Sequence, residues 1–286
     1  MPWRDLYPFQ SRYLQLGPHR LHYLDQGAGQ PLLLVHGNPT WSFYWRNLIR
    51  GLAGDFRCLA VDHIGCGLSD KPQVYPYTLP RRIDDLVQVV ERLDLTGTTL
   101  LAHDWGGAIG LGTVQRLPQR FARIVLFNTG AFPPPFVPWR ITACRLPLAG
   151  TLAVRGLNAF ARAALSMAVE KPERMTADVR AGLLAPYDSW ASRVAVDRFV
   201  KDIPFSPRHP TWQILERIEA GLDSLAHLPI QLIWGMRDWC FRPECLERFL
   251  KHWPSAEVHR FEDCGHYVVE DAHERIVPLV RAFLKR

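Results

Sequence analysis

The chain has 286 residues, of which 48% are hydrophobic and 22% are charged, and this is the composition of an ordinary globular protein. Its net charge of +6 comes from scattered arginines, with no Lys/Arg block and no nucleic-acid-binding motif, so composition argues against a nucleic-acid partner. No apolar run approaches the length of a transmembrane segment.

The cysteines and residues 1–10 indicate the cellular compartment of the protein. The six cysteines form no CxxC pair and show no metal-ligand spacing, and residues 1–10 lack the apolar stretch of a signal peptide. We therefore expect reduced thiols, no metal site and a cytoplasmic protein.

Short apolar runs alternate with helical patterns along most of the chain. A hairpin signal, Gly17-Pro18, joins the first two predicted strands, 12–16 and 20–25. Further strands are predicted at 31–35, 58–61, 98–102, 124–127, 230–234 and 257–261, and helices at 45–52, 81–93, 108–116, 245–252 and 272–284. This alternation predicts an α/β fold with a mostly parallel, doubly wound sheet.

One interval interrupts the alternation. Residues 131–218 are helical in pattern and rich in Pro, Trp and Arg, and Pro133-Pro134-Pro135 opens them as a hinge. We expect a helical cap there, late in the sheet, between core segments 1–130 and 219–286. The apolar stretch 146–168 favours a cap that lines an apolar pocket over a helical excursion with no role in binding.

A carboxylate stands at the junction of a buried strand and a helix. Residues 99–108 read Thr-Leu-Leu-Ala-His-Asp-Trp-Gly-Gly-Ala, which is typical of the nucleophile elbow of an α/β-hydrolase. A carboxylate with a pKa of about 4 is ionised at neutral pH, so Asp104 is predicted to form a covalent ester with a carbon electrophile. The alternative is that Asp104 merely caps the helix.

Two further positions supply donors. Asn38 follows a buried strand and Gly37, so its peptide N–H is expected to face an oxyanion and its side-chain amide a leaving group. The alternative at Asn38-Pro39 is a plain turn. Trp105, directly after the nucleophile, offers its peptide N–H and its indole N–H.

An acid and a base follow in the chain order that this fold requires. Asp238 lies in the loop after strand 230–234, where an acid orients the catalytic histidine. The rival loop, Asn128-Thr129-Gly130, has no carboxylate. His266 follows the last strand and is the one histidine that fits the position of the base.

These motifs resemble the haloalkane dehalogenase branch of the α/β-hydrolases. The resemblance rests on the loop His-Gly-Asn-Pro-Thr-Trp-Ser (36–42), the elbow Asp-Trp-Gly-Gly (104–107) and Gly265-His266. It implies that Asn38 and Trp105 hold the leaving group. An acid after the late strand, as here, matches only some dehalogenase subfamilies.

A closer resemblance, over nearly the whole chain, is to the β-lactone decarboxylases of bacterial long-chain olefin biosynthesis. It rests on residues 62–72, 128–133 and 185–190. It implies a cofactor-free lyase that converts cis-3-alkyl-4-alkyloxetan-2-ones to cis-olefins and CO2. It also implies that the protein acts together with a condensing enzyme, a reductase and a β-lactone synthetase.

Several hypotheses about the reaction stay open at this point. Asp104 attacks either the ring carbon that bears oxygen or the lactone carbonyl. In a haloalkane dehalogenase, His266 would instead activate water to hydrolyse the Asp104 ester. An epoxide hydrolase needs a pair of tyrosines, of which only Tyr187 is a candidate. A non-catalytic scaffold is disfavoured because all three triad positions are filled.

Overall fold

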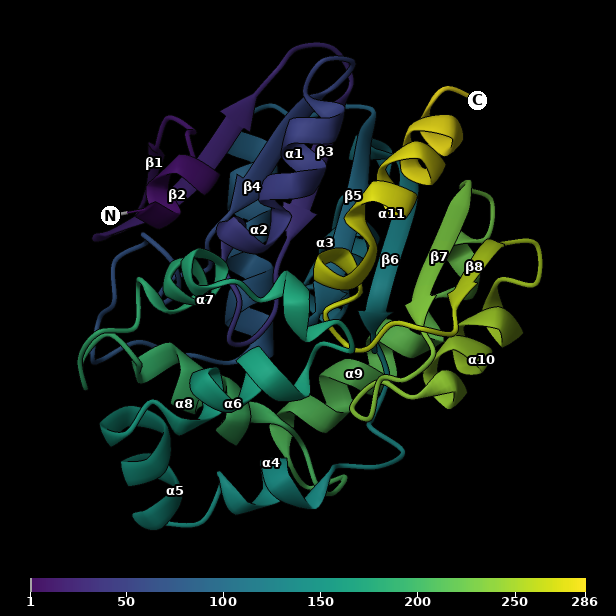
Figure 1. Cartoon of the computed structure of the whole chain (residues 1–286). Helices are drawn as coiled ribbons and strands as arrows, with labels where there is room; N and C mark the ends of the chain where they lie inside the picture. The colour runs from purple at the N-terminus through teal and green to yellow at the C-terminus, as the bar shows by residue number, and fades with distance from the viewer. Residues whose placement is uncertain (1) are drawn as a thin grey trace.

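A computed structural model of the chain describes residues 2–286 and places eight strands in one sheet (Figure 1). The strands are β1 (Arg12–Leu16), β2 (His19–Gln26), β3 (Pro31–Val35), β4 (Arg57–Val61), β5 (Thr98–Asp104), β6 (Phe121–Thr129), β7 (Ile230–Gly235) and β8 (Glu257–Phe261). Their order is β1-β2-β4-β3-β5-β6-β7-β8. Strand β2 pairs antiparallel with β1 and β4, and the remaining pairs are parallel. The predicted α/β fold with a mostly parallel sheet is confirmed.

Among residues 2–286 the structure has eleven α-helices, some of which cover the two faces of the sheet. They are α1 (Arg46–Leu52), α2 (Leu79–Arg92), α3 (Trp105–Arg116), α4 (Trp139–Ala143), α5 (Ala149–Thr151), α6 (Ala159–Met167), α7 (Ala177–Leu184), α8 (Val194–Asp202), α9 (Pro210–Ala220), α10 (Pro243–His252) and α11 (Val268–Leu284). Helices α1 and α11 contribute to one buried apolar cluster, and α2, α3 and α10 to another. Figure 1 shows α1 and α11 in front of the sheet.

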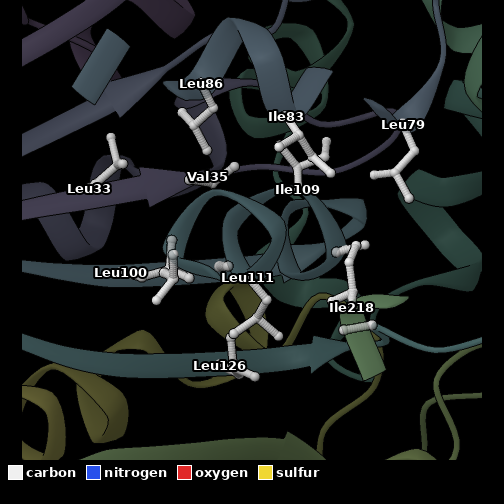
Figure 2. Close-up of a cluster of buried hydrophobic side chains, with 14 of the residues drawn as sticks. Leu33, Val35, Leu79, Ile83, Leu86, Leu100, Ile109, Leu111, Leu126 and Ile218 are labelled. Atoms are coloured by element: carbon white, nitrogen blue, oxygen red, sulfur yellow. The ribbon is translucent and has the colours of Figure 1, made fainter. Parts of the chain in front are cut away.

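Strand β3 shows why the central strands read as continuous apolar runs. Leu33 and Val35 belong to the cluster under α2 and α3, whereas Leu32 and Leu34 belong to the cluster under α1 and α11. Because successive side chains point to opposite faces, a strand covered on both sides must be apolar throughout. Figure 2 shows Leu33 and Val35 with side chains such as Leu86 in the first cluster.

Several elements are longer than their sequence patterns predict, and two of these extensions lie near the site. Strand β6 continues beyond 124–127 and includes the polar residues Asn128 and Thr129 at its carboxyl end. Helix α11 begins at Val268, before the predicted start at Ala272. Ala272 has non-helical torsion angles (φ −147°, ψ 26°), and this kink interrupts the helical pattern in the sequence. Both extensions bring the chain toward the same edge of the sheet.

The helices of residues 131–218 lie beyond the carboxyl ends of the parallel strands (Figure 1). They are α4 to α8 and most of α9, with a π-helical turn at Leu152–Gly156 after α5. Helix α9 continues past residue 218, and Ile218 packs in the core cluster under α2 and α3. This region is therefore attached to the sheet layer through α9. Among residues 2–286, no helix has the length and apolarity needed to cross a bilayer.

One buried ion pair joins distant parts of this layer. Arg46 on α1 donates from Nη1 to Glu270 Oε1 at 2.5 Å and from Nη2 to Oε2 at 2.8 Å, and both side chains are buried. Removing one partner leaves an uncompensated charge in the interior.

We expect Arg46→Met to lower the free energy of unfolding by about 3–5 kcal/mol, because Glu270 then remains buried without its cation. The matched control is Arg116→Met, whose pair with Asp84 is half exposed, and it should cost less than about 1 kcal/mol. Urea unfolding of both variants measures the difference. Equal losses would show that the buried pair has no special role.

Candidate active site

The turn between β5 and α3 projects Asp104 from the carboxyl edge of the sheet. Asp104 has φ +55° and ψ −131°, in the left-handed region that side chains rarely adopt. The next turn of chain passes so close to β3 that a Cβ on Gly106 would lie 2.1 Å from the Val35 carbonyl oxygen. The Asp104 side chain makes no capping hydrogen bond to α3. The helix-cap alternative therefore does not describe this residue.

The Asp104 carboxyl is held by the first loop. The Asn38 N–H donates to Asp104 Oδ1 at 2.6 Å. Gly37 makes this approach possible, because a Cβ there would lie 2.0 Å from the same oxygen. Burial raises the pKa of Asp104 above its usual 3.8, and His266 together with the peptide N–H groups of Asn38 and Trp105 opposes this rise. These contacts favour the charged form of a buried carboxylate.

His266 lies between two carboxylates. Its Nδ1 is 2.8 Å from Asp238 Oδ2, and its Nε2 is 3.6 Å from Asp104 Oδ2. Burial alone would lower the pKa of His266, but the charge and hydrogen bond of Asp238, together with Asp104, raise it above 6.5. The ring also stacks on Phe241, with centroids 5.6 Å apart. The histidine is thus fixed in orientation, with Nε2 directed toward Asp104.

Asp238 is oriented by donors that sequence reasoning missed. Its Oδ1 accepts the N–H groups of Cys240 (2.6 Å) and Phe241 (3.0 Å), and its Oδ2 accepts Asn128 Nδ2 (3.0 Å). Asn128 also exchanges two hydrogen bonds with the backbone of Gly235, at 2.9 and 2.7 Å, and so joins β6 to β7. The loop Asn128-Thr129-Gly130 has no carboxylate of its own, but it supplies the amide that positions the carboxylate of Asp238. The sequence feature that could have indicated this role is a polar amide, Asn128, near the end of an apolar strand.

Asn38 and Trp105 both line the cavity next to Asp104. Asn38 Nδ2 donates to the Val196 carbonyl oxygen on α8 at 3.3 Å, which leaves the second amide hydrogen for another acceptor. Asn38 Oδ1 is buried without a hydrogen-bond partner. Trp105 packs near Phe199, with ring centroids 5.7 Å apart. The two predicted donors are therefore brought together with Asp104.

The cavity has a volume of about 480 Å³ and is mostly apolar. Its walls come from the carboxyl edge of the sheet and from the helical region, and include Phe132, Phe136, Ile141, Phe160, Met167, Leu215 and Trp239. The expectation that residues 146–168 line the pocket holds only for part of that stretch. Residues of α6 face the cavity, whereas the leucines at 146, 148, 152 and 157 are exposed.

Two other kinds of site find no support in this geometry. Tyr187 is buried, donates to the Thr40 carbonyl oxygen at 3.3 Å and does not line the cavity, so it is not placed to serve an epoxide hydrolase. Within residues 2–286, no three His, Cys, Asp or Glu side chains are arranged to hold a metal ion.

Comparisons with known proteins agree with the fold described above. Residues 30–146 match the family model described as alpha/beta hydrolase fold. Over 98% of its length the chain is 42% identical to the cis-3-alkyl-4-alkyloxetan-2-one decarboxylase of Shewanella oneidensis, of which it covers 89%. It is 43% identical, again over 98% of its length, to the protein of the same name from Xanthomonas campestris pv. campestris, of which it covers 97%.

A solved structure shows the same fold in a different enzyme. Haloalkane dehalogenase DatA from Agrobacterium tumefaciens C58 superposes with a TM-score of 0.89 at 26% identity, covering 97% of this chain and 96% of that one. The chain therefore has the backbone of a dehalogenase but a sequence much nearer to the two decarboxylases.

The His266–Asp238 contact makes a titration prediction. In the wild-type protein His266 should keep its proton to a pH above 6.5, because its pKa is raised. Asp238→Asn removes the charge that outweighs burial, so the pKa should fall by at least about 1. NMR titration of the imidazole measures both values. Asp263→Asn, on a half-exposed carboxylate paired with Arg275, is the control and should leave the pKa unchanged. An unchanged pKa in Asp238→Asn would contradict the assignment.

Proposed function

The chain belongs to the family of the cis-3-alkyl-4-alkyloxetan-2-one decarboxylases, and we propose that it converts cis-3,4-dialkyl β-lactones to cis-olefins and CO2 with Asp104 as the nucleophile. One observation carries the proposal. The Asp104 carboxylate lines an apolar cavity with Oδ1 held by the Asn38 N–H and Oδ2 facing His266 Nε2. A carboxylate held in this way is directed at carbon rather than at a proton.

In the first step Asp104 attacks C4, the ring carbon that bears the ring oxygen. The C4–O bond breaks, strain is released, and the lactone carbonyl becomes a free carboxylate beside the new Asp104–C4 ester. The side-chain amide of Asn38 and the indole N–H of Trp105 are the donors for the departing oxygen. This role corresponds to the leaving-group role that the dehalogenase resemblance implies for them.

In the second step the bond between C3 and the carboxylate breaks. Its electron pair forms the C3=C4 double bond, the C4–O bond of the ester breaks, and Asp104 returns as a carboxylate while CO2 leaves. Attack by Asp104 opposite the ring oxygen places the ester anti to the carboxylate. Anti elimination from that conformer keeps the two alkyl groups cis.

Attack at the lactone carbonyl does not complete a catalytic cycle in the same way. It would give a mixed anhydride of Asp104 and leave the ring oxygen on C4, so Asp104 would return only after hydrolysis to a hydroxy acid. Attack at C4 releases olefin, CO2 and free Asp104 with no other reactant. We therefore propose that the first bond forms between the Asp104 carboxylate and C4.

His266 then has a role other than activating water. With its pKa raised by Asp238, it donates from Nε2 toward Asp104 Oδ2 and stabilises the carboxylate as it departs from C4. The apolar walls of the cavity disfavour water near the ester. Loss of CO2 is thereby favoured over hydrolysis, which is the outcome in a haloalkane dehalogenase.

The surroundings of the reaction follow from its substrate. A long-chain dialkyl β-lactone is strained and sparingly soluble, so it benefits from transfer over a short distance. We infer that the protein works in the cytoplasm beside the β-lactone synthetase and the reductase of the olefin pathway. The motifs at 62–72, 128–133 and 185–190 support this inference.

Purified protein should release olefin and CO2 from a cis-dialkyl β-lactone and should release little bromide from 1-bromoalkanes. Asp104→Asn should lower olefin formation by at least about 10⁴-fold, because the nucleophile is lost. Asp84→Asn, a half-exposed carboxylate on α2, is the control and should keep wild-type activity. Gas chromatography and a bromide assay measure the products. Bromide release without olefin would reject the decarboxylase assignment in favour of a dehalogenase.

Isotope labelling tests the position of attack. A lactone with ¹⁸O at both its ring and carbonyl oxygens should release CO2 that carries both labels, because attack at C4 leaves the whole carboxyl group intact. Mass spectrometry of the headspace during the first turnovers measures the label. A hydroxy acid in solution in place of doubly labelled CO2, identified by mass spectrometry, would contradict attack at C4 and indicate attack at the carbonyl.

A further inference from the structure

An exposed apolar surface lies on the segment from Phe136 to Leu157, which we name the outer segment. Six of the ten large hydrophobic side chains that are exposed among residues 2–286 fall within it: Phe136, Trp139, Leu146, Leu148, Leu152 and Leu157. Leu148 is 82% exposed, and Trp139 and Leu157 are each 72% exposed. Single exposed leucines are ordinary, but a cluster of this kind marks an interaction surface.

The charges of the outer segment are all positive. It contains Arg140, Arg145 and Arg155, and no Asp or Glu occurs anywhere between Ala131 and Val169. Within the described chain, no carboxylate lies within 4.0 Å of the nitrogens of these arginines. Their hydrogen-bond partners are neutral: Arg145 donates to the Val200 and Ile203 carbonyl oxygens, and Arg155 donates to the Trp190 carbonyl and the Gln73 side chain.

The acids whose charges act on Arg155 and Arg145 are paired with other basic side chains. Asp197, whose charge opposes the lowering of the Arg155 pKa by burial, is buried and pairs with Lys201 at 2.7 Å. Asp202, which faces Arg145, is buried and lies 3.5 Å from Arg82. The outer segment thus combines exposed apolar side chains with positive charge that no carboxylate of the segment balances; Arg140 is exposed, and Arg145 and Arg155 are half-buried.

Its position in the molecule suits a flat partner. Figure 1 shows α4 and α5 at the bottom of the molecule, on the side of the helical region that is remote from the sheet. Leu148 stands at φ +60°, a backbone conformation in which a side chain is strained, and it is the most exposed side chain of the segment. Phe136, Arg140 and Ile141 also line the cavity, so the exposed surface adjoins the cavity wall.

We propose that the outer segment docks the protein on the surface of an anionic lipid bilayer. The exposed leucines and Trp139 enter the boundary between headgroups and acyl chains, the exposed Arg140 binds lipid phosphate, and Arg145 and Arg155 add to the positive potential of the segment. A bilayer is favoured over a protein partner because the charged side chains of the segment are all positive, which complements anionic headgroups. Docking itself does not depend on the proposed reaction. If that reaction is correct, a lipophilic substrate enters the cavity from the bilayer beside it.

Vesicle flotation tests the proposal. The wild-type protein should float with vesicles of phosphatidylglycerol and phosphatidylcholine, far less with phosphatidylcholine alone, and less at high salt. The triple variant Leu148→Ser, Leu152→Ser, Leu157→Ser should bind the anionic vesicles at least about tenfold more weakly, since apolar insertion is lost. Val74→Ser is the matched control, because Val74 is 93% exposed and lies outside the segment.

Three results would overturn the proposal. They are failure of the wild-type protein to float with anionic vesicles, equal binding of the triple variant and Val74→Ser, and a wild-type dimer in solution that the triple variant converts to monomer. The last would show that a second copy covers the segment. None of the three leucines lines the cavity, so turnover of a short, soluble β-lactone should be equal in all variants. That assay shows that the triple variant is folded. If no protein releases olefin while flotation behaves as expected, the proposed function fails and the docking proposal stands.

Discussion

The site depends on one constraint, which is the burial of a carboxylate that must stay charged. Asp104 lies at the end of a strand with no exposed face, and burial raises its pKa. The charged form is recovered by the Asn38 N–H at 2.6 Å, the Trp105 N–H and the His266 imidazole. Each of these donors requires a particular backbone path: Gly37 lets the first loop approach, and the strained turn at Asp104 directs the second N–H back at the carboxyl. The local geometry of β3, β5 and α3 follows from this need.

The same constraint extends outward to the acid and base. A second buried carboxylate, Asp238, raises the pKa of the histidine between them, because a protonated imidazole would lie between two carboxylates. Asp238 in turn depends on Asn128 and on two peptide N–H groups for its orientation. A nucleophile that must leave again needs such a partner. An Asp104 ester that expels its carboxylate without water gains from a nearby proton on Nε2, whereas hydrolysis would need that nitrogen unprotonated.

Much of the fold and the grouping of Asp104, Asp238 and His266 could be predicted from the sequence, because they rest on local signals. Strands buried on both faces read as apolar runs, and the turn at Asp104 needs small residues beside it. Asn128 could not be found in this way, since its importance comes from hydrogen bonds to Gly235 and Asp238, more than a hundred residues away. The contact between Asn38 and Val196 is equally non-local. Such pairs become visible only when the sheet order places their strands and helices side by side.

The apolar stretch 146–168 shows a further limit of the same kind. Its composition predicts a pocket wall, and α6 does supply Phe160 and Met167 to the cavity. The leucines before α6 have the same chemistry but face outward, because residues 149–156 form a short helix and a π-helical turn at the edge of the molecule. Hydrophobicity alone does not distinguish a side chain that contacts substrate from one that is exposed. The exposed leucines share their segment with arginines that have no carboxylate partner, and this combination is what our docking proposal rests on.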